Sequence, residues 1–414
     1  ARWSPRGYVK WVLLDFPGSV QKEKVTTYQL EYGPEIKRAQ PKTLLSITRE
    51  RELIHVTTGP LEFSVRESGF SFLESARLNG KDLIRGSRIT LRDEFDNVYE
   101  AAGDKDSTVT IEEAGPIRAV IAAKGWFVHR GRKVGRYVVR IYAYAGQPYL
   151  RVFHTFIITE RTKKVRYRNI SLESRLTRTG ERVFGTAGGR VLTDNSHAWL
   201  VQESHDRYRV ATSRLKGEKV IAAGNRSSGW VDASGVTVAV RDMWQQFPKE
   251  LEIEGRDLRV HFWPRHPGPV RHPREKVTAQ DIHMLWFAHE GDLLDFSIPA
   301  DYASFPKGRD EFHYIPNVLK HKSDEALGIA KTHEMIWYFH ESDADVSDEV
   351  SALSQDIACL PDPKWIAQSG VLGRIHPVDT EHFPHIETAL STHFDYLQRM
   401  TEYLNDYGMW NFGD

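Results

Sequence analysis

The first candidates for chemistry are histidine and tyrosine side chains that could transfer a proton. His333 lies in the stretch Lys-Thr-His at 331–333, in a predicted strand on which its two neighbours face the opposite way. His313 and Tyr314 are adjacent in a loop, and such a pair could act as base and acid. The alternatives are a hydrogen-bonded histidine inside a β-sandwich at 333 and a chance adjacency at 313–314. A zinc-protease motif is excluded at 333–337, because Trp337 stands where the second histidine ligand is required.

A basic loop is the candidate for binding carboxylates. Residues 263–274 read Trp-Pro-Arg-His-Pro-Gly-Pro-Val-Arg-His-Pro-Arg, and the prolines argue against a regular strand or helix. Arg265, His266 and Arg271 are therefore expected on an irregular surface segment, where an arginine could hold a carboxylate through two parallel hydrogen bonds. A solvated linker is the alternative.

Three further groups of residues favour structural interpretations. Residues 93–97, Asp-Glu-Phe-Asp-Asn, gather oxygen ligands of the kind calcium prefers, but they lack the glycine and final glutamate of an EF-hand loop, so a solvated turn is favoured. Residues 185–190 lack the Lys-Ser/Thr of a phosphate loop and are predicted to form a turn. His382, His385 and His393 are expected on the surface. The sequence predicts no metal site and no cofactor, with a structural or carboxylate-neutralising calcium ion as the alternative.

Composition narrows the class of protein. The 414 residues exceed one ordinary core, so two or three domains are expected. The 56 basic and 56 acidic residues balance, which argues against a nucleic-acid or membrane-surface partner. A single cysteine, Cys359, excludes an intrachain disulfide and is expected to pack in a helix as a small buried apolar side chain. The 11 Trp, 16 Tyr and 19 Phe favour either sugar binding, since sugar C–H faces stack on rings, or a large sandwich core.

The elements that must position these residues are mostly strands. Between residues 44 and 339 short apolar runs alternate with Gly, Asn and Asp turns, and Asn79-Gly80 is a strong hairpin signal. Residues 136–144 and 149–159 form two long predicted strands joined by a short turn. We therefore expect one antiparallel sandwich over residues 44–339 with few or no helices.

The pattern becomes helical after residue 340. The first predicted helix begins with Ser347 as its N-cap and is stopped by Pro361; its apolar positions are Val346, Val350, Leu353, Ile357 and Leu360. A loop rich in Pro and Gly follows over 361–384, and a second helix runs from Ile386 through Leu404 and ends at Gly408. Two helices cannot bury two apolar stripes alone, so they are expected to begin a helical domain, with docking on the sandwich as the alternative.

Four stretches resemble one family of carbohydrate enzymes. Residues 3–33, 236–264 (including Trp244), 328–335 and 407–414 are similar to segments of the exo-rhamnogalacturonan lyase (YetA-like) polysaccharide lyase family. The resemblance implies a mainly β chain: a partial N-terminal β-barrel at 1–43, a large antiparallel, galactose-mutarotase-like β-sandwich at 44–345, and the first helices of an α/α toroid at 346–414. It also implies that the start of the barrel and most of the toroid are missing, so that residues 1–414 alone are expected to be inactive.

The resemblance also implies a reaction. A lyase that cleaves a uronate polymer by β-elimination removes the C5 proton and expels the C4 oxygen, so it needs a base, an acid and a group that neutralises the carboxylate. The implied catalytic residues are His333, His313 and Tyr314, and the implied substrate-binding residues are Arg265, His266, Arg271, Trp244, Trp410 and Asp414. Residues 407–414 could instead be a helix-capping turn with packed rings.

The expected partner is an acidic polysaccharide of the rhamnogalacturonan or ulvan type, cleaved from a chain end, with no nucleic acid and no membrane. The competing hypotheses are a non-catalytic carbohydrate-binding or structural sandwich and, third, a glycoside hydrolase. The segment before Val9 is too short and polar for a secretory signal, so export is expected only if a preceding segment carries one. Oligomeric state is left open.

Overall fold

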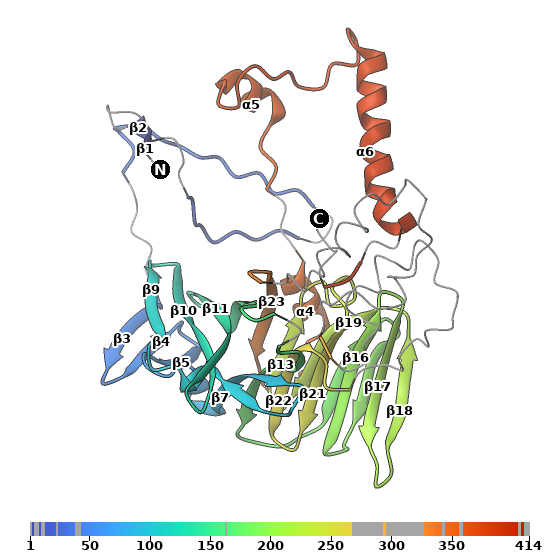
Figure 1. The fold of residues 1–414 in the computed structure, drawn as a ribbon. Helices are drawn as coiled ribbons and strands as arrows, with labels where there is room; N and C mark the ends of the chain where they lie inside the picture. Colours follow the sequence, from blue (N-terminus) through green and yellow to red (C-terminus); the bar gives the residue numbers. More distant parts are fainter. Residues whose placement is uncertain are drawn as a thin grey trace.

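The computed structural model describes residues 2–3, 8–9, 13–21, 24–37, 43–161, 164–266, 293–294, 327–341, 344–355, 359–404 and 407–409. All strand pairs within this part of the chain are antiparallel, and, apart from one pair of two-residue strands at residues 2–9, they belong to two large sheets (Figure 1). This confirms the predicted mainly β, antiparallel class.

The first sheet joins early strands to later ones through β13, which pairs with both β7 and β22. Its strands, in spatial order, are β3 (Ser46–Glu50), β4 (Leu53–Thr57), β5 (Leu61–Arg66), β6 (Ser75–Leu78), β7 (Lys81–Asp93), β13 (Tyr167–Leu176), β22 (Asp257–Trp263), β21 (Lys249–Glu254), β16 (His197–Ser204), β17 (Arg207–Ser213) and β18 (Glu218–Gly224).

The second sheet is joined in the same way by β23, which pairs with both β12 and β20. Its strands, in spatial order, are β9 (Thr108–Ala114), β10 (Arg118–His129), β11 (Arg132–Tyr144), β12 (Tyr149–Ile157), β23 (Ala330–Phe339), β20 (Val236–Val240), β19 (Ser227–Ala233), β14 (Arg182–Thr186) and β15 (Gly189–Thr193).

One edge connects the two sheets. The short strand β8 (Val98–Glu100) pairs with β7 of the first sheet and β10 of the second, beside a 3₁₀ turn, η1 (Ala101–Gly103). The sheets therefore form a sandwich that is nearly closed into a barrel. One hydrophobic core fills the space between them and takes residues from both, such as Leu251 and Phe262 from the first sheet and Val152 and Trp337 from the second.

Local sequence explains several of these elements. Residues 149–157 alternate strictly between partly exposed and buried, as a strand with one core face requires. Asn79 and Gly80 have φ of 47° and 80°, so they form the predicted two-residue hairpin between β6 and β7. Residues 187–188 form the predicted turn between β14 and β15.

The first helix differs in part from its prediction. Helix α4 (Ser347–Ser354) begins one residue earlier than predicted, because Val346 rather than Ser347 occupies the N-cap position, and the Ser347 hydroxyl donates to Asp345 instead. It ends at Ser354 rather than at Pro361. Cys359 therefore lies beyond the helix and is exposed, so the prediction that it packs in a helix is wrong. Helix α4 docks on the sandwich, since Val346 and Val350 pack with residues of β20 and β23.

The remaining helices are α5 (Pro363–Ser369) and α6 (Pro384–Leu404). Helix α5 was not predicted; it begins at a proline in the first turn, with the Asp362 carboxylate accepting from the Lys364 amide as N-cap. Helix α6 confirms the second predicted helix, and its apolar side chains are exposed as it extends away from the sheets (Figure 1). None of the described helices is long and apolar enough to cross a membrane.

Among the described residues of the segment 1–43, only β1 (Arg2–Trp3) and β2 (Tyr8–Val9) form strands, and they pair with each other. The partial barrel and the toroid therefore stay predictions.

Gly185 shows how tightly the second sheet is packed. A methyl group at this position would overlap the indole of Trp230 on the neighbouring strand β19. We expect Gly185→Ala to lower the free energy of unfolding by about 1–3 kcal/mol, because overpacking displaces a buried ring. Urea unfolding measures the change. Gly188→Ala is the matched control, since the nearest atom there is 4.0 Å away, and equal midpoints for the two variants would contradict the prediction.

Candidate functional site

His333 lies in the core between the two sheets. It stands opposite His154 on the neighbouring strand, and both rings stack on Phe262 of the facing sheet, with centroid separations of 4.7 Å and 4.2 Å. His333 is 1% exposed, and neither ring nitrogen has a hydrogen-bond partner among the described residues. Burial, helped by the charges of Lys249 and Lys331, holds the pKa of His333 well below its ordinary value. Among the described residues the core encloses His333, and its catalytic role stays a prediction.

Arg265 and His266 belong to a cluster that sequence reasoning missed. Residues 249–254 read Lys-Glu-Leu-Glu-Ile-Glu, so Glu250, Glu252 and Glu254 share one face of β21 while the apolar residues between them enter the core. The same alternation puts Arg259 and His261 on that face of β22, directly opposite Glu252 and Glu250. This alternation of acidic and apolar residues, followed by basic and apolar residues, is the sequence signal that could have revealed the cluster.

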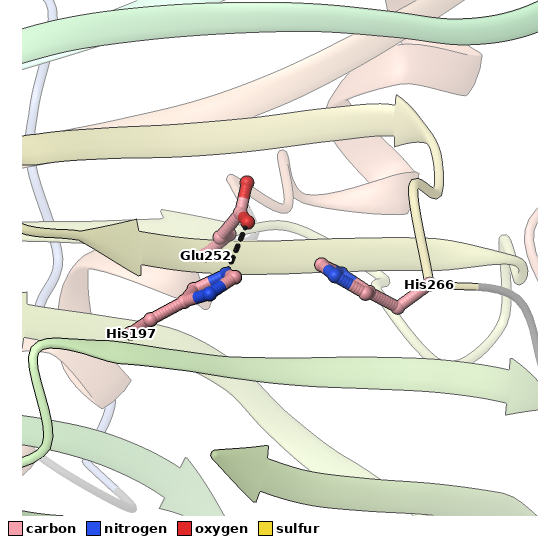
Figure 2. Close-up of side chains that lie close together, drawn as sticks. All are labelled: His197, Glu252 and His266. Carbon is pink, nitrogen blue, oxygen red and sulfur yellow. Dashed lines mark hydrogen bonds and ion pairs between the residues drawn. The ribbon is translucent and has the colours of Figure 1, made fainter. Parts of the chain in front are cut away.

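Glu252 is the centre of this group, three members of which are drawn in Figure 2. We call the group the carboxylate–histidine cluster; its members are His197, Glu250, Glu252, Arg259, His261, Arg265 and His266. Glu252 is fully buried, and its Oε1 lies 2.7 Å from His197 Nε2 and 3.2 Å from Arg265 Nη1. Its Oε2 accepts from His261 Nε2 at 2.9 Å and from Arg259 at 3.2 Å. Burial alone would raise the pKa of Glu252, but the two histidine hydrogen bonds and the Arg259 charge hold it well below its ordinary range.

Glu250 organises the start of the basic loop. Its Oε2 accepts from the backbone amides of Arg265 and His266 at 3.0 and 2.8 Å, and its Oε1 lies 2.8 Å from His266 Nδ1. The His266 ring also stacks on Trp199, with centroids 4.1 Å apart. Burial lowers the pKa of His266, but the Glu250 carboxylate more than offsets this, so the net shift is upward. Arg265 and His266 are therefore bound to internal carboxylates, rather than forming the solvated linker that was the alternative.

A second cluster surrounds Trp244, the predicted sugar-binding residue. The Arg226 guanidinium lies over the Trp244 ring at 3.8 Å, and the Tyr407 ring meets Trp244 edge-on at 4.9 Å. Tyr407 also stacks on His205, which lies in the turn between β16 and β17, at 5.9 Å. Glu402, near the end of α6, pairs with Arg226 at 3.1 and 3.5 Å. We call Arg226, Trp244, Tyr407, His205 and Glu402 the arginine–aromatic cluster.

Backbone contacts fix the C-terminal side of this cluster on the sandwich. The Gly408 amide donates to the Gln245 carbonyl at 2.7 Å, and the Met409 amide donates to the Phe247 carbonyl at 2.8 Å. Met409 is fully buried in the core. Burial and a hydrogen bond to Glu402 raise the pKa of Tyr407 to about 12, and hydrogen bonds from Arg226 and Tyr407 lower the pKa of Glu402.

The structure thus brings Trp244 together with Tyr407, the first residue of the stretch 407–414, whereas the ring contacts of His333 are to Phe156 and Phe262. Residues Arg271, His313, Tyr314, Trp410 and Asp414 lie outside the described residues. His382, His385 and His393 are exposed, as expected.

The turn at 93–97 is confirmed, but its first residue is not solvated. Asp93 is buried, and its carboxylate accepts hydrogen bonds from the backbone of Phe95 and the backbone and side chain of Asn97. Its oxygen atoms thus stabilise the turn.

Comparison with known proteins gives a match to a domain family and to a curated relative. Residues 45–182 match the model described as PcRGLX-like protein central beta sandwich domain. YetA of Bacillus subtilis (strain 168), whose name states no function, is 24% identical, and the similarity covers 100% of this chain and 53% of the relative. The chain therefore spans about half the length of the curated relative it matches.

Among solved structures, a putative aldose 1-epimerase from Klebsiella pneumoniae is 7% identical with a TM-score of 0.34, covering 75% of this chain and 87% of that one. A putative aldose 1-epimerase from Escherichia coli K12 is 9% identical with a TM-score of 0.29, covering 71% and 98%. These likenesses are too distant to bear on function. The specific similarity is that of residues 45–182 to the central β-sandwich domain of PcRGLX-like proteins, which fits a family related to rhamnogalacturonan lyases.

Proposed function

We propose that this chain works as part of a polysaccharide lyase that cleaves a rhamnose–uronate polymer, of the rhamnogalacturonan or ulvan type, from a chain end by β-elimination. The observation that carries the proposal is the arginine–aromatic cluster, in which an arginine and a tyrosine contact a tryptophan and a histidine stacks on the tyrosine. The domain match at 45–182 supports the carbohydrate class.

Arg226 is the group assigned to the uronate carboxylate. Its two terminal nitrogens already meet the two oxygens of Glu402, at 3.5 and 3.1 Å, in the two-point manner that suits a carboxylate. Glu402 thus stands in for a uronate, and the substrate would replace it. A guanidinium on the carboxylate stabilises the negative charge that develops when the C5 proton leaves.

His205 and Tyr407 are assigned the proton transfers. In the elimination a base removes the C5 proton, the C4–O bond breaks as the C4–C5 double bond forms, and an acid protonates the departing oxygen. The pKa of about 12 keeps the Tyr407 hydroxyl protonated near neutral pH, so it suits the acid. His205, stacked on the Tyr407 ring at 5.9 Å, is assigned the base. Trp244 would contact the sugar face.

The test uses the full-length protein with rhamnogalacturonan and, separately, ulvan. We expect a rise in ultraviolet absorbance from the new double bond, with small products from the first turnovers. Reducing ends without that absorbance would indicate a glycoside hydrolase. Tight binding with no product would indicate a carbohydrate-binding sandwich, and either result would contradict the proposal.

A further inference from the structure

The carboxylate–histidine cluster on β21 and its neighbours has a donor set that the proposed lyase reaction does not use. His197, Glu252 and His266 each offer one ligand atom, and these three atoms all lie within 4.8 Å of one another (Figure 2). They come from β16, from β21 and from the residues after β22, so the fold rather than a local motif assembles them. We propose that these three residues form a binding site for a zinc-like divalent transition-metal ion.

The surroundings of His266 are those of a metal ligand. Because a carboxylate only accepts hydrogen bonds, Glu250 Oε1 at 2.8 Å fixes the ring proton on Nδ1 and leaves the Nε2 lone pair for a metal. A carboxylate behind the ligating histidine is the usual second contact in zinc sites, where it orients the ring. The amides of Arg265 and His266 hold Glu250 in turn, and Trp199 stacks on the imidazole.

Glu252 is oriented in the same manner. His261 Nε2 and Arg259 Nη1 hold its Oε2, at 2.9 and 3.2 Å, which leaves Oε1 directed toward His197 at 2.7 Å. The tautomer of His261 is fixed because Asn169 Nδ2, 2.9 Å away, donates to its Nδ1. Metal binding would replace the contact between His197 and Glu252, with the His197 ring proton on Nδ1.

The chemistry of the donors selects the ion. Two imidazole nitrogens and one carboxylate oxygen are the ligands of zinc and other first-row transition metals, whereas calcium and magnesium prefer oxygen alone. Ligand atoms around a tetrahedral zinc ion are separated by about 3.3–3.5 Å, so small side-chain movements bring these atoms into place. Arg265 would have to leave Glu252 Oε1, and its side chain is 49% exposed and so can turn outward.

The experiment is zinc binding to the metal-free full-length protein, followed by calorimetry and by the thermal unfolding midpoint. We expect one Zn²⁺ per chain at this site, a midpoint that rises with Zn²⁺, and no such rise with Ca²⁺. Cobalt(II) in place of zinc should give the intense visible absorption of a four-coordinate site.

Two ligand variants and one control make the test specific. His197→Gln and His266→Gln should each weaken Zn²⁺ binding by at least about 100-fold. His382→Gln should leave it unchanged, because His382 pairs with Asp379 on the exposed surface outside the cluster. If His266→Gln fails to fold, His197→Gln decides. Absence of binding in the unaltered protein, or equal binding in His197→Gln, would overturn the proposal. Neither result depends on lyase activity.

Discussion

Replacing Arg226 with alanine is expected to lower kcat/KM on a uronate polymer by about 100- to 1,000-fold. Removing one group that stabilises developing negative charge typically has an effect of this size. Arg226→Lys should keep part of the activity, because lysine retains the charge but cannot meet both carboxylate oxygens or stack as a plane on Trp244. Initial rates of double-bond formation by the full-length protein measure the loss.

A competing explanation is that Arg226 only docks α6 through its ion pair with Glu402. The two explanations differ in the effect of Glu402→Gln. If Arg226 binds substrate, this variant removes an internal competitor, so KM should fall or stay the same. If the ion pair only docks α6 on the sandwich, Glu402→Gln should lose as much activity as Arg226→Ala. Arg85→Ala, at a largely exposed arginine remote in sequence, controls for a general loss of positive charge.

The strands could be predicted because their signals are local. Alternation at 149–157 and the Asn79-Gly80 turn depend only on neighbouring residues, and the structure confirms both. Helix α4 shows the limit of the same reasoning. Its apolar spacing continues to Leu360, yet the helix ends at Ser354, and Leu360 is exposed. Among the described residues, Val346, Val350 and Leu353 pack against the sandwich whereas Leu360 does not, so tertiary contact rather than spacing sets the end of this helix.

The candidate sites could be predicted only in part, because they join distant segments. Trp244 could be identified as a candidate from the stretch 236–264. Its partner Arg226 forms an ion pair with Glu402, which lies 176 residues further along the chain, and no local pattern links Arg226 to Glu402. His266 and Arg265 were expected to face a substrate. The carboxylates that bind them lie on β21, and that pairing follows from strand order, which the sequence pattern does not specify.

The second large expected effect is a loss of stability in acid caused by His154 and His333. Burial lowers the pKa of His154 to about 3, and burial with the nearby Lys249 and Lys331 charges holds the pKa of His333 well below 6.5. In the unfolded chain both histidines bind protons below about pH 6.5, whereas in the folded chain they stay neutral. The unfolded state therefore binds more protons, and the stability present above pH 6.5 is lost as pH falls.

For each histidine the slope is about 0.7 kcal/mol per pH unit at pH 6.5 and approaches about 1.4 kcal/mol per pH unit at lower pH. Lowering the pH from 6.5 to 5 should therefore reduce the free energy of unfolding by about 3 kcal/mol through this pair. Urea unfolding of His154→Phe and His333→Phe should each show a smaller pH slope in this window, in which most carboxylates remain ionised.

The raised pKa values of His266 and His340 give the opposite slope, so the difference between variant and unaltered protein is the quantity to measure. Val152→Ala, a buried substitution on the same strand as His154 that changes no titratable group, should keep the original slope. If His154→Phe and His333→Phe also keep the original slope, the prediction that these two histidines are buried as neutral side chains is wrong. They would then either bind protons in the folded state or have polar partners beyond the described residues.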